Sequence, residues 1–178
     1  MHRIRRRRRR VNGKFAASAI AAGFLLAAAS GHAAPASGHT ASVIRPGMAA
    51  PSLAAATAIV FARAQLGKPY VWGGTGPDAF DCSGLTQAAW RAAGVAIART
   101  SQDQWATLPH VAAANVRPGD LVFFPGSDGT WSAPGHVAIV SGPGQMIQAY
   151  ATGTPIEVSP LSGAGAGGIV GYARPGAS

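Results

Sequence analysis

The chain has 178 residues, and 15 Lys and Arg against six Asp and Glu give it a formal net charge of +9. The basic excess lies at the N-terminus, because residues 1–33 hold eight basic residues and no acidic one. A nucleic-acid binder gathers its basic residues on one face or along one element. The rest of the chain is nearly neutral and shows no such cluster, which excludes nucleic acid as an expected partner.

The N-terminus has the layout of a secretory signal peptide. A basic stretch, Arg3–Lys14, precedes an apolar, Ala-rich run, Phe15–Ala29, and small residues follow. The apolar run is shorter than the ~20 residues that a spanning helix needs. We therefore expect residues 1–33 to be a signal peptide cleaved after Ala33. The mature protein would be secreted to the cell wall or periplasmic space without a membrane anchor; an uncleaved anchor is the alternative.

The rest of the chain divides into a short segment and one domain. Residues 34–53 are rich in Ala, Ser, Pro and Gly and lack apolar periodicity. Such a composition predicts a flexible linker or a short pro-segment. Residues 54–175 then form one domain of ordinary size, long enough to bury a single core.

The first half of this domain has the patterns of helices. Asp81 stands in the N-cap position of the second helix and Gly94 at its end, while Thr100 or Ser101 caps the third. A glycine-rich loop, Pro69–Phe80, joins the first two. The predicted helices are Ala54–Leu66, Cys82–Ala93 and Ser101–Leu108.

The second half changes to short apolar runs that are typical of strands. Gly142-Pro143-Gly144 joins two of them into a hairpin. Helices followed by meander-like strands predict an α+β fold, with the N-terminal helices packed on one face of a central antiparallel sheet. The predicted strands are Asp120–Phe124, His136–Ser141, Gln145–Ala149, Ile156–Val158 and Ile169–Ala173.

Cys82 is the only cysteine, so the chain cannot form an internal disulfide. An odd cysteine in an exported protein indicates a partner chain or a reactive thiol. Cys82 begins the second predicted helix, where the helix dipole and free N–H groups favour a thiolate. The alternative is a buried cysteine that acts as a small hydrophobe.

A thiolate nucleophile needs a base, which is usually His. Two candidates lie in the domain. His110 lies in a polar connection, where we expect it at the surface, whereas His136 opens a strand directly after Gly135. We therefore predict His136 as the base. Two His, one Cys and scattered carboxylates show no zinc-ligand spacing, so we expect no metal and no other cofactor.

The base in turn needs an orienting partner. The predicted hairpin allows two registers, one placing Tyr150 and the other Gln148 opposite His136. Gln148 interrupts an otherwise apolar strand. Its amide oxygen can accept a hydrogen bond from Nδ1–H of His136 and fix the tautomer. The alternative is an edge-strand Gln that faces water.

Five sequence blocks follow one another in a characteristic order: Lys68–Gly74, Asp81–Leu85, Arg99–Gln104, Arg117–Phe124 and Gly135–Val140. Together they resemble the NlpC/p60 cell-wall peptidases across nearly the whole predicted domain. The stretch Gly142–Tyr150 is also similar to the mycobacterial peptidoglycan endopeptidases of this family. The resemblance implies a papain-like α+β fold and a cysteine endopeptidase. It further implies hydrolysis of peptidoglycan stem peptides, typically at the γ-D-glutamyl–meso-diaminopimelate bond.

The resemblance also assigns roles to individual residues. Cys82 matches the catalytic nucleophile and His136 the base. Gln148 matches the third polar position, which is commonly His, so this chain carries a variant there. Peptidoglycan is the implied partner, and we expect a monomer.

Three further residues match the substrate side of the family's site. Tyr70 matches a tyrosine whose hydroxyl assists the backbone N–H of Cys82 at the oxyanion. Asp81 and Ser83 match positions that line the substrate cleft. The structural alternatives are a packed aromatic, an N-cap and a first-turn helix residue.

A rival function is a catalytically weak or inactive peptidoglycan-binding module on the same fold. Some relatives have lost the Cys or the His and only bind the wall. This sequence keeps both Cys82 and His136, which favours the enzyme.

Overall fold

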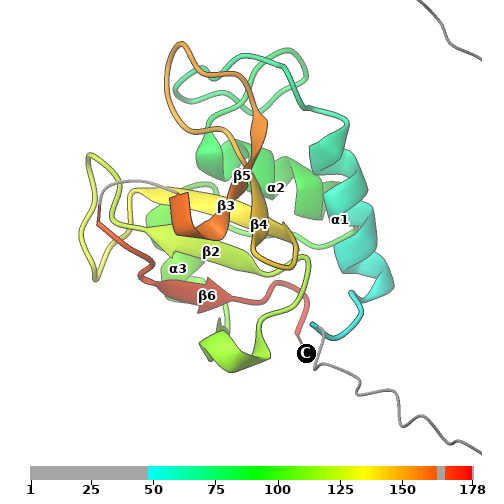
Figure 1. The fold of residues 1–178 in the computed structure, drawn as a ribbon. Helices are drawn as coiled ribbons and strands as arrows, with labels where there is room; N and C mark the ends of the chain where they lie inside the picture. The colour runs from blue at the N-terminus through cyan, green and yellow to red at the C-terminus, as the bar shows by residue number, and fades with distance from the viewer. Residues whose placement is uncertain (1–47, 164–166, 178) are drawn as a thin grey trace, which may run out of the picture. The chain divides into compact units, whose positions relative to one another are not determined.

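The computed structural model describes residues 48–163 and 167–177 (Figure 1). The predicted signal peptide, residues 1–33, and the predicted linker up to residue 47 lie outside the described residues. Residues Met48–Ser52 of the predicted linker have no regular secondary structure, whereas its last residue, Leu53, begins the first helix. Within the described ranges, no helix is both long enough and apolar enough to span a membrane.

Three helices form, each started by a capping side chain. They are α1 (Leu53–Arg63), α2 (Cys82–Ala92) and α3 (Ser101–Thr107). Ser52, Asp81 and Thr100 each accept a hydrogen bond from the backbone N–H three residues on, which satisfies a donor that the helix leaves free. The cap at Asp81 is the predicted one, and for the third helix the structure selects Thr100 over Ser101.

Helix α1 ends at Arg63, three residues before the predicted end at Leu66. After Arg63 the chain turns away from the helix and toward the end of the sheet. The backbone N–H of Gly67 donates to Ile156 at 2.9 Å, and the carbonyl of Lys68 accepts from the same residue at 2.8 Å. Gly67 has a φ of +84°, a backbone conformation that glycine adopts without steric cost.

Six strands form one antiparallel sheet in the order β1-β6-β2-β3-β4-β5. The two-residue strand β1 was not predicted, and it carries the exposed His110. The α+β prediction, with helices packed on an antiparallel sheet, is confirmed. The strands are β1 (His110–Val111), β2 (Leu121–Phe124), β3 (His136–Gly142), β4 (Gln145–Gln148), β5 (Glu157–Pro160) and β6 (Gly171–Ala173).

The β3–β4 hairpin selects one of the two registers that the sequence left open. Ile139 lies opposite Ile147, and a bulge follows before Gly142. Extending this register places Tyr150 opposite His136. Gln148 is then a diagonal neighbour of His136 on the same face of the sheet, because alternate residues of a strand share a face.

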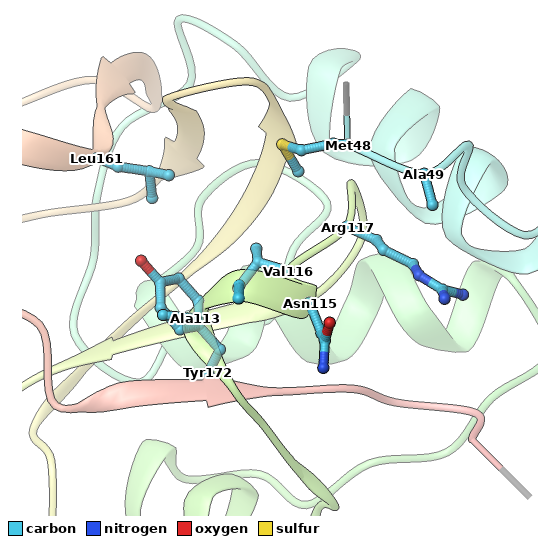
Figure 2. Close-up of a pocket in the computed structure, with 9 residues that line it drawn as sticks. Met48, Ala49, Ala113, Asn115, Val116, Arg117, Leu161 and Tyr172 are labelled. Carbon is cyan, nitrogen blue, oxygen red and sulfur yellow. The ribbon is translucent and has the colours of Figure 1, made fainter. Parts of the chain in front are cut away.

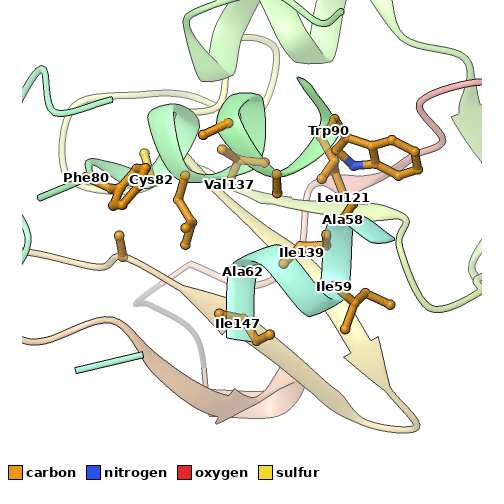
Figure 3. Packing of buried hydrophobic residues seen from close by; sticks show 14 of the residues in the cluster. Ala58, Ile59, Ala62, Phe80, Cys82, Trp90, Leu121, Val137, Ile139 and Ile147 are labelled. Atoms are coloured by element: carbon orange, nitrogen blue, oxygen red, sulfur yellow. The ribbon is translucent and has the colours of Figure 1, made fainter. Parts of the chain in front are cut away.

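The sheet separates two apolar clusters. Helices α1 and α2 cover one face, where the cluster includes Ile59, Leu85, Trp90, Phe123 and Ile139 (Figure 3). Five buried side chains form the second cluster on the other face: Val122, Phe124, Ala138, Val140 and Met146. Burial on both faces explains why the strands read as continuous apolar runs rather than as alternating ones.

An open cavity of about 420 Å³ lies over the second face (Figure 2). Met48, Val116, Leu161 and Tyr172 are among the residues that line it. None of the six predicted site residues borders this cavity, so it is separate from the predicted chemistry.

Candidate active site

Cys82 is the first residue of α2, and its side chain lies beside Phe80 at the edge of the core (Figure 3). The residue is 8% exposed. Its Sγ lies 3.9 Å from the carbonyl oxygen of Gly135, the residue before His136. The fold therefore brings the start of α2, with the predicted nucleophile, next to the start of β3, where the predicted base His136 lies.

A cavity of about 390 Å³ opens beside Cys82. Asp81 and Ser83 line it, at the positions that the resemblance assigns to the substrate cleft. Trp72, Arg99 and Asp128 line it as well, and the sequence analysis gave these three no role. Among residues 48–163 and 167–177, no three His, Cys, Asp or Glu side chains are placed to hold a metal ion.

Asp81 connects three segments of the site. Its Oδ1 accepts the N–H of Gly84 at 2.6 Å as the helix cap, and its Oδ2 accepts the N–H of Gly73 at 2.9 Å. The Arg99 guanidinium donates to both carboxylate oxygens, at 3.1 and 2.6 Å, and to Ser83 Oγ at 2.9 Å. Asp81 is therefore the N-cap of α2, as its structural alternative predicted. The same side chain also fixes the glycine-rich loop at Gly73 and the Arg99 guanidinium, which border the cleft.

Arg99→Lys should lower the free energy of unfolding by about 1 kcal/mol, because an ammonium cannot make the bidentate pair with Asp81 and reach Ser83 as well. Arg91→Lys, at an exposed position in the last turn of α2, is the matched control and should change little. Urea unfolding of both variants measures the difference. Equal stabilities would show that the Arg99 pair adds nothing to the fold.

His136 and Gln148 meet directly, with 3.0 Å between Nε2 of the ring and Oε1 of the amide. The nitrogen that faces Gln148 is therefore Nε2 and not the predicted Nδ1. Nε2 is the ring nitrogen farther from the backbone and reaches across to the neighbouring strand. Within the described residues, Nδ1 of His136 makes no hydrogen bond of its own.

Two aromatic rings hold the His136 imidazole. Tyr150 meets it edge-on at 5.3 Å between centroids, and Phe124 lies 5.7 Å away. His136 is 4% exposed. Within the described part of the chain, no hydrogen bond joins Cys82 to His136. Catalytic hydrogen bonds are often long without substrate and tighten when it binds.

Burial opposes charge on both members of the predicted pair. It raises the pKa of the Cys82 thiol to about 11, against the backbone groups of Val137 and Ser83, which favour the thiolate. Burial also lowers the pKa of His136, although the bond to Gln148 opposes this. Burial therefore acts against the thiolate that the helix start favours.

The lowered pKa of His136 predicts acid sensitivity of the fold. Between pH 6.5 and the lower native pKa, the unfolded imidazole binds a proton that the native one does not, so stability falls as the pH falls, by at most about 1.4 kcal/mol per pH unit. His136→Asn should flatten this part of the curve. His110→Asn, which removes an exposed imidazole, is the control. Melting temperatures measured between pH 7.5 and 5.5 test this acid sensitivity. Parallel curves for wild type and His136→Asn would refute the role of His136.

Tyr70 is buried in the same apolar cluster as Cys82. Burial raises the pKa of its phenol to about 12, and the negative charges of Cys82 and Asp81 add to the effect. The hydroxyl therefore stays protonated over the neutral range and keeps its capacity to donate. Its packing agrees with the structural alternative, and its role at the oxyanion stays a prediction.

Five residues around the site had no predicted role: Trp72, Arg99, Asp128, Glu157 and Ser159. Arg99 opens one of the blocks that carry the resemblance, and this position was the available signal for it. Glu157 and Ser159 contact Gln148, and no local pattern announces this because it depends on the register between β4 and β5.

The sequence matches the NlpC/P60 family over residues 67–168. A probable endopeptidase of Corynebacterium glutamicum is 46% identical over 110 residues, which is 61% of this chain and 50% of that protein. A probable endopeptidase p60 of Listeria innocua is 41% identical over 117 residues, 65% of this chain and 24% of that one. The match therefore spans about half the length of the first relative and a quarter of the second.

Solved structures agree with this match. The peptidoglycan hydrolase RipB of Mycobacterium tuberculosis has a TM-score of 0.58 at 34% identity, covering 68% of this chain and 64% of that one. NlpC1 of Trichomonas vaginalis has a TM-score of 0.64 at 25% identity, covering 72% of this chain and 46% of that one. Sequence and fold thus agree on one assignment, and the chain belongs to the NlpC/P60 family, whose relatives include probable endopeptidases and a peptidoglycan hydrolase.

Proposed function

We propose that this chain is a secreted cysteine peptidase that hydrolyses peptidoglycan stem peptides in cell-wall remodelling, at the γ-D-glutamyl–meso-diaminopimelate bond. The observation that carries the proposal is the meeting of Cys82, at the start of α2, with the segment of β3 whose His136 is held by Gln148. A relative described as a peptidoglycan hydrolase supports the choice of substrate.

Acylation requires the Cys82 proton to leave, because the thiolate is the nucleophile. The Cys82 proton passes to Nδ1 of His136 while the sulfur attacks the carbonyl carbon of the scissile bond. The first backbone N–H groups of α2, with the Tyr70 hydroxyl, stabilise the oxyanion, and one such donor contributes about 3–4 kcal/mol. The C–N bond then breaks as Nδ1 returns the proton to the leaving amine, and a thioester remains on Cys82.

Deacylation repeats the proton path with water. Nδ1 of His136 accepts a proton from the water as its oxygen attacks the thioester carbonyl. The C–S bond breaks, the carboxylic acid leaves, and the proton returns to the sulfur. Gln148 takes part in neither transfer, because an amide is no base at neutral pH; its contribution is to hold the ring.

The charges that line the cleft fit a stem peptide with a free ammonium group. The carboxylate of Asp81 is paired with Arg99. Asp128 also lines the cavity, and its carboxylate makes no ion pair within the described residues. A carboxylate in this position favours a cationic substrate group, such as the second amine of meso-diaminopimelate.

Mass spectrometry of peptidoglycan digested with the purified mature protein tests the proposed reaction. We expect fragments with a new free amine on diaminopimelate and a matching set that ends in D-glutamate. Products cut at another bond would replace the proposed specificity. Sequencing the N-terminus of the exported protein tests secretion, and a start near Ala34 is the expected result.

The second candidate function is a wall-binding module without turnover. The burial of Cys82, which is 8% exposed, favours it, because a thiol buried in apolar surroundings is less reactive. The two functions differ in a simple measurement. A binding module would retain peptidoglycan in a pull-down and release no fragments even after prolonged incubation, whereas the enzyme releases them.

A further inference from the structure

Two side chains of β5 hold the Gln148 amide on the side away from His136. Glu157 lies directly opposite Gln148 in the sheet. Nε2 of Gln148 donates to Ser159 Oγ at 3.0 Å and to Glu157 Oε1 at 3.3 Å. Ser159 Oγ in turn donates to the same carboxylate oxygen at 2.8 Å. The amide is therefore bonded on both sides, to β3 and to β5.

Only one arrangement of protons satisfies the hydrogen bonds among Gln148, Ser159 and Glu157. A carboxylate accepts hydrogen bonds and donates none. Because the one hydroxyl proton of Ser159 is directed at Glu157, the Ser159 oxygen can only accept from Gln148. The NH₂ of Gln148 must then face β5, and its Oε1 must face His136. Turning the amide over would place its oxygen against the Glu157 carboxylate.

We propose that Glu157, acting through Ser159 and Gln148, sets the tautomer of His136. An oxygen facing Nε2 requires a proton on Nε2, so Nδ1 keeps its lone pair for the Cys82 proton. Glu157 is a positioning residue: it touches neither the substrate nor the thiol. The kinetic consequence rests on the proposed function, whereas the tautomer itself does not.

Burial leaves these hydrogen bonds few alternative partners. His136 and Gln148 are each 4% exposed and Ser159 is 9% exposed, so water cannot easily replace a lost partner. An unmatched polar group in such a place is costly. Glu157 is half-buried and supplies a charge at the outer end of the chain of hydrogen bonds. The uncharged Gln148 thereby gains a charged partner.

Nitrogen-15 NMR of the His136 ring at pH 7.5 measures the tautomer directly, with the His136→Gln spectrum used for assignment. The wild type should carry its proton on Nε2. Glu157→Lys should turn the Gln148 amide over, because an ammonium donates to its Oε1. The NH₂ of Gln148 then faces Nε2 of His136, which moves the ring proton to Nδ1. Val158→Thr, at the exposed position between Glu157 and Ser159, is the matched control and should keep the wild-type signals.

Kinetics on the mature protein give the second readout. Glu157→Lys should lower kcat by about 10–100-fold with KM within about twofold, the pattern of a group that acts on the transition state only. Ser159→Ala, which removes a single oxygen, should lower kcat severalfold and populate both tautomers. If circular dichroism shows that Glu157→Lys does not fold, Ser159→Ala provides the test instead.

The outcomes separate the two proposals. A proton that stays on Nε2 in the folded variants, or a kcat equal to that of Val158→Thr, overturns the role of Glu157 and leaves the peptidase intact. A wild type that carries its proton on Nε2 and shifts it in Glu157→Lys, but never cleaves peptidoglycan, overturns the proposed function and supports the tautomer assignment.

Discussion

Replacement of Cys82 by alanine will abolish cleavage of peptidoglycan peptides and leave the fold intact. No other thiol exists in the chain, so no neighbouring group can substitute as the nucleophile. We expect turnover to fall by roughly 10³-fold or more, as happens when a covalent nucleophile is lost. The loss of one buried sulfur should lower the free energy of unfolding by only about 1 kcal/mol.

Release of soluble fragments from purified peptidoglycan measures the effect of Cys82→Ala, and a pull-down with the same material measures binding. Binding should persist, because the cleft residues Asp81, Ser83 and Arg99 remain. Persistent turnover by the purified variant would remove Cys82 from the mechanism. A wild type that binds as well as the variant and also releases nothing would establish the wall-binding alternative.

The helix starts and the fold class were predictable from sequence because their causes are local. Asp81 and Thr100 are capping residues directly before the helices that they start, and the glycine-rich turn before β4 marks the hairpin. The end of α1 was not predictable in this way. It is set by hydrogen bonds between Gly67, Lys68 and Ile156, which lie far apart in the chain.

The same distinction applies to the candidate site. Cys82, His136 and Gln148 were found from residue type, position and family resemblance. The ring nitrogen that meets Gln148 depends on the β3–β4 register, and the contact with Glu157 depends on the β4–β5 register. The sequence reveals a helix start, which favours a thiolate, but not the burial that opposes it. At Cys82, burial raises the pKa of the thiol more than the neighbouring backbone groups lower it.

Gly84→Ala should damage both the fold and the site. Gly84 stands in the first turn of α2, against the glycine-rich loop that runs over the helix start. A Cβ at this position would lie 2.0 Å from the carbonyl oxygen of Gly74 and 2.9 Å from Oδ1 of Asp81. The Gly74 carbonyl cannot move freely, because it accepts the backbone N–H of Asp81 at 3.0 Å.

The clash should outweigh the higher helix propensity of alanine, which alone would favour the variant by up to about 1 kcal/mol. Overpacking costs about 1–3 kcal/mol and more where backbone must shift. We therefore expect a loss of about 2 kcal/mol or more in the free energy of unfolding. Activity should fall with it, because the displaced loop carries Trp72 and Gly73 at the cleft and the cap at Asp81 positions Cys82.

Gly142→Ala is the matched control, since a Cβ there meets nothing within 4 Å. It should leave both the melting temperature and turnover near the wild-type values. Thermal unfolding and peptidoglycan digestion of the two variants side by side provide the measurement. Equal stability of Gly84→Ala and Gly142→Ala would mean that the loop yields easily. The close contact at Gly74 would then not be what holds Cys82 in place beside β3.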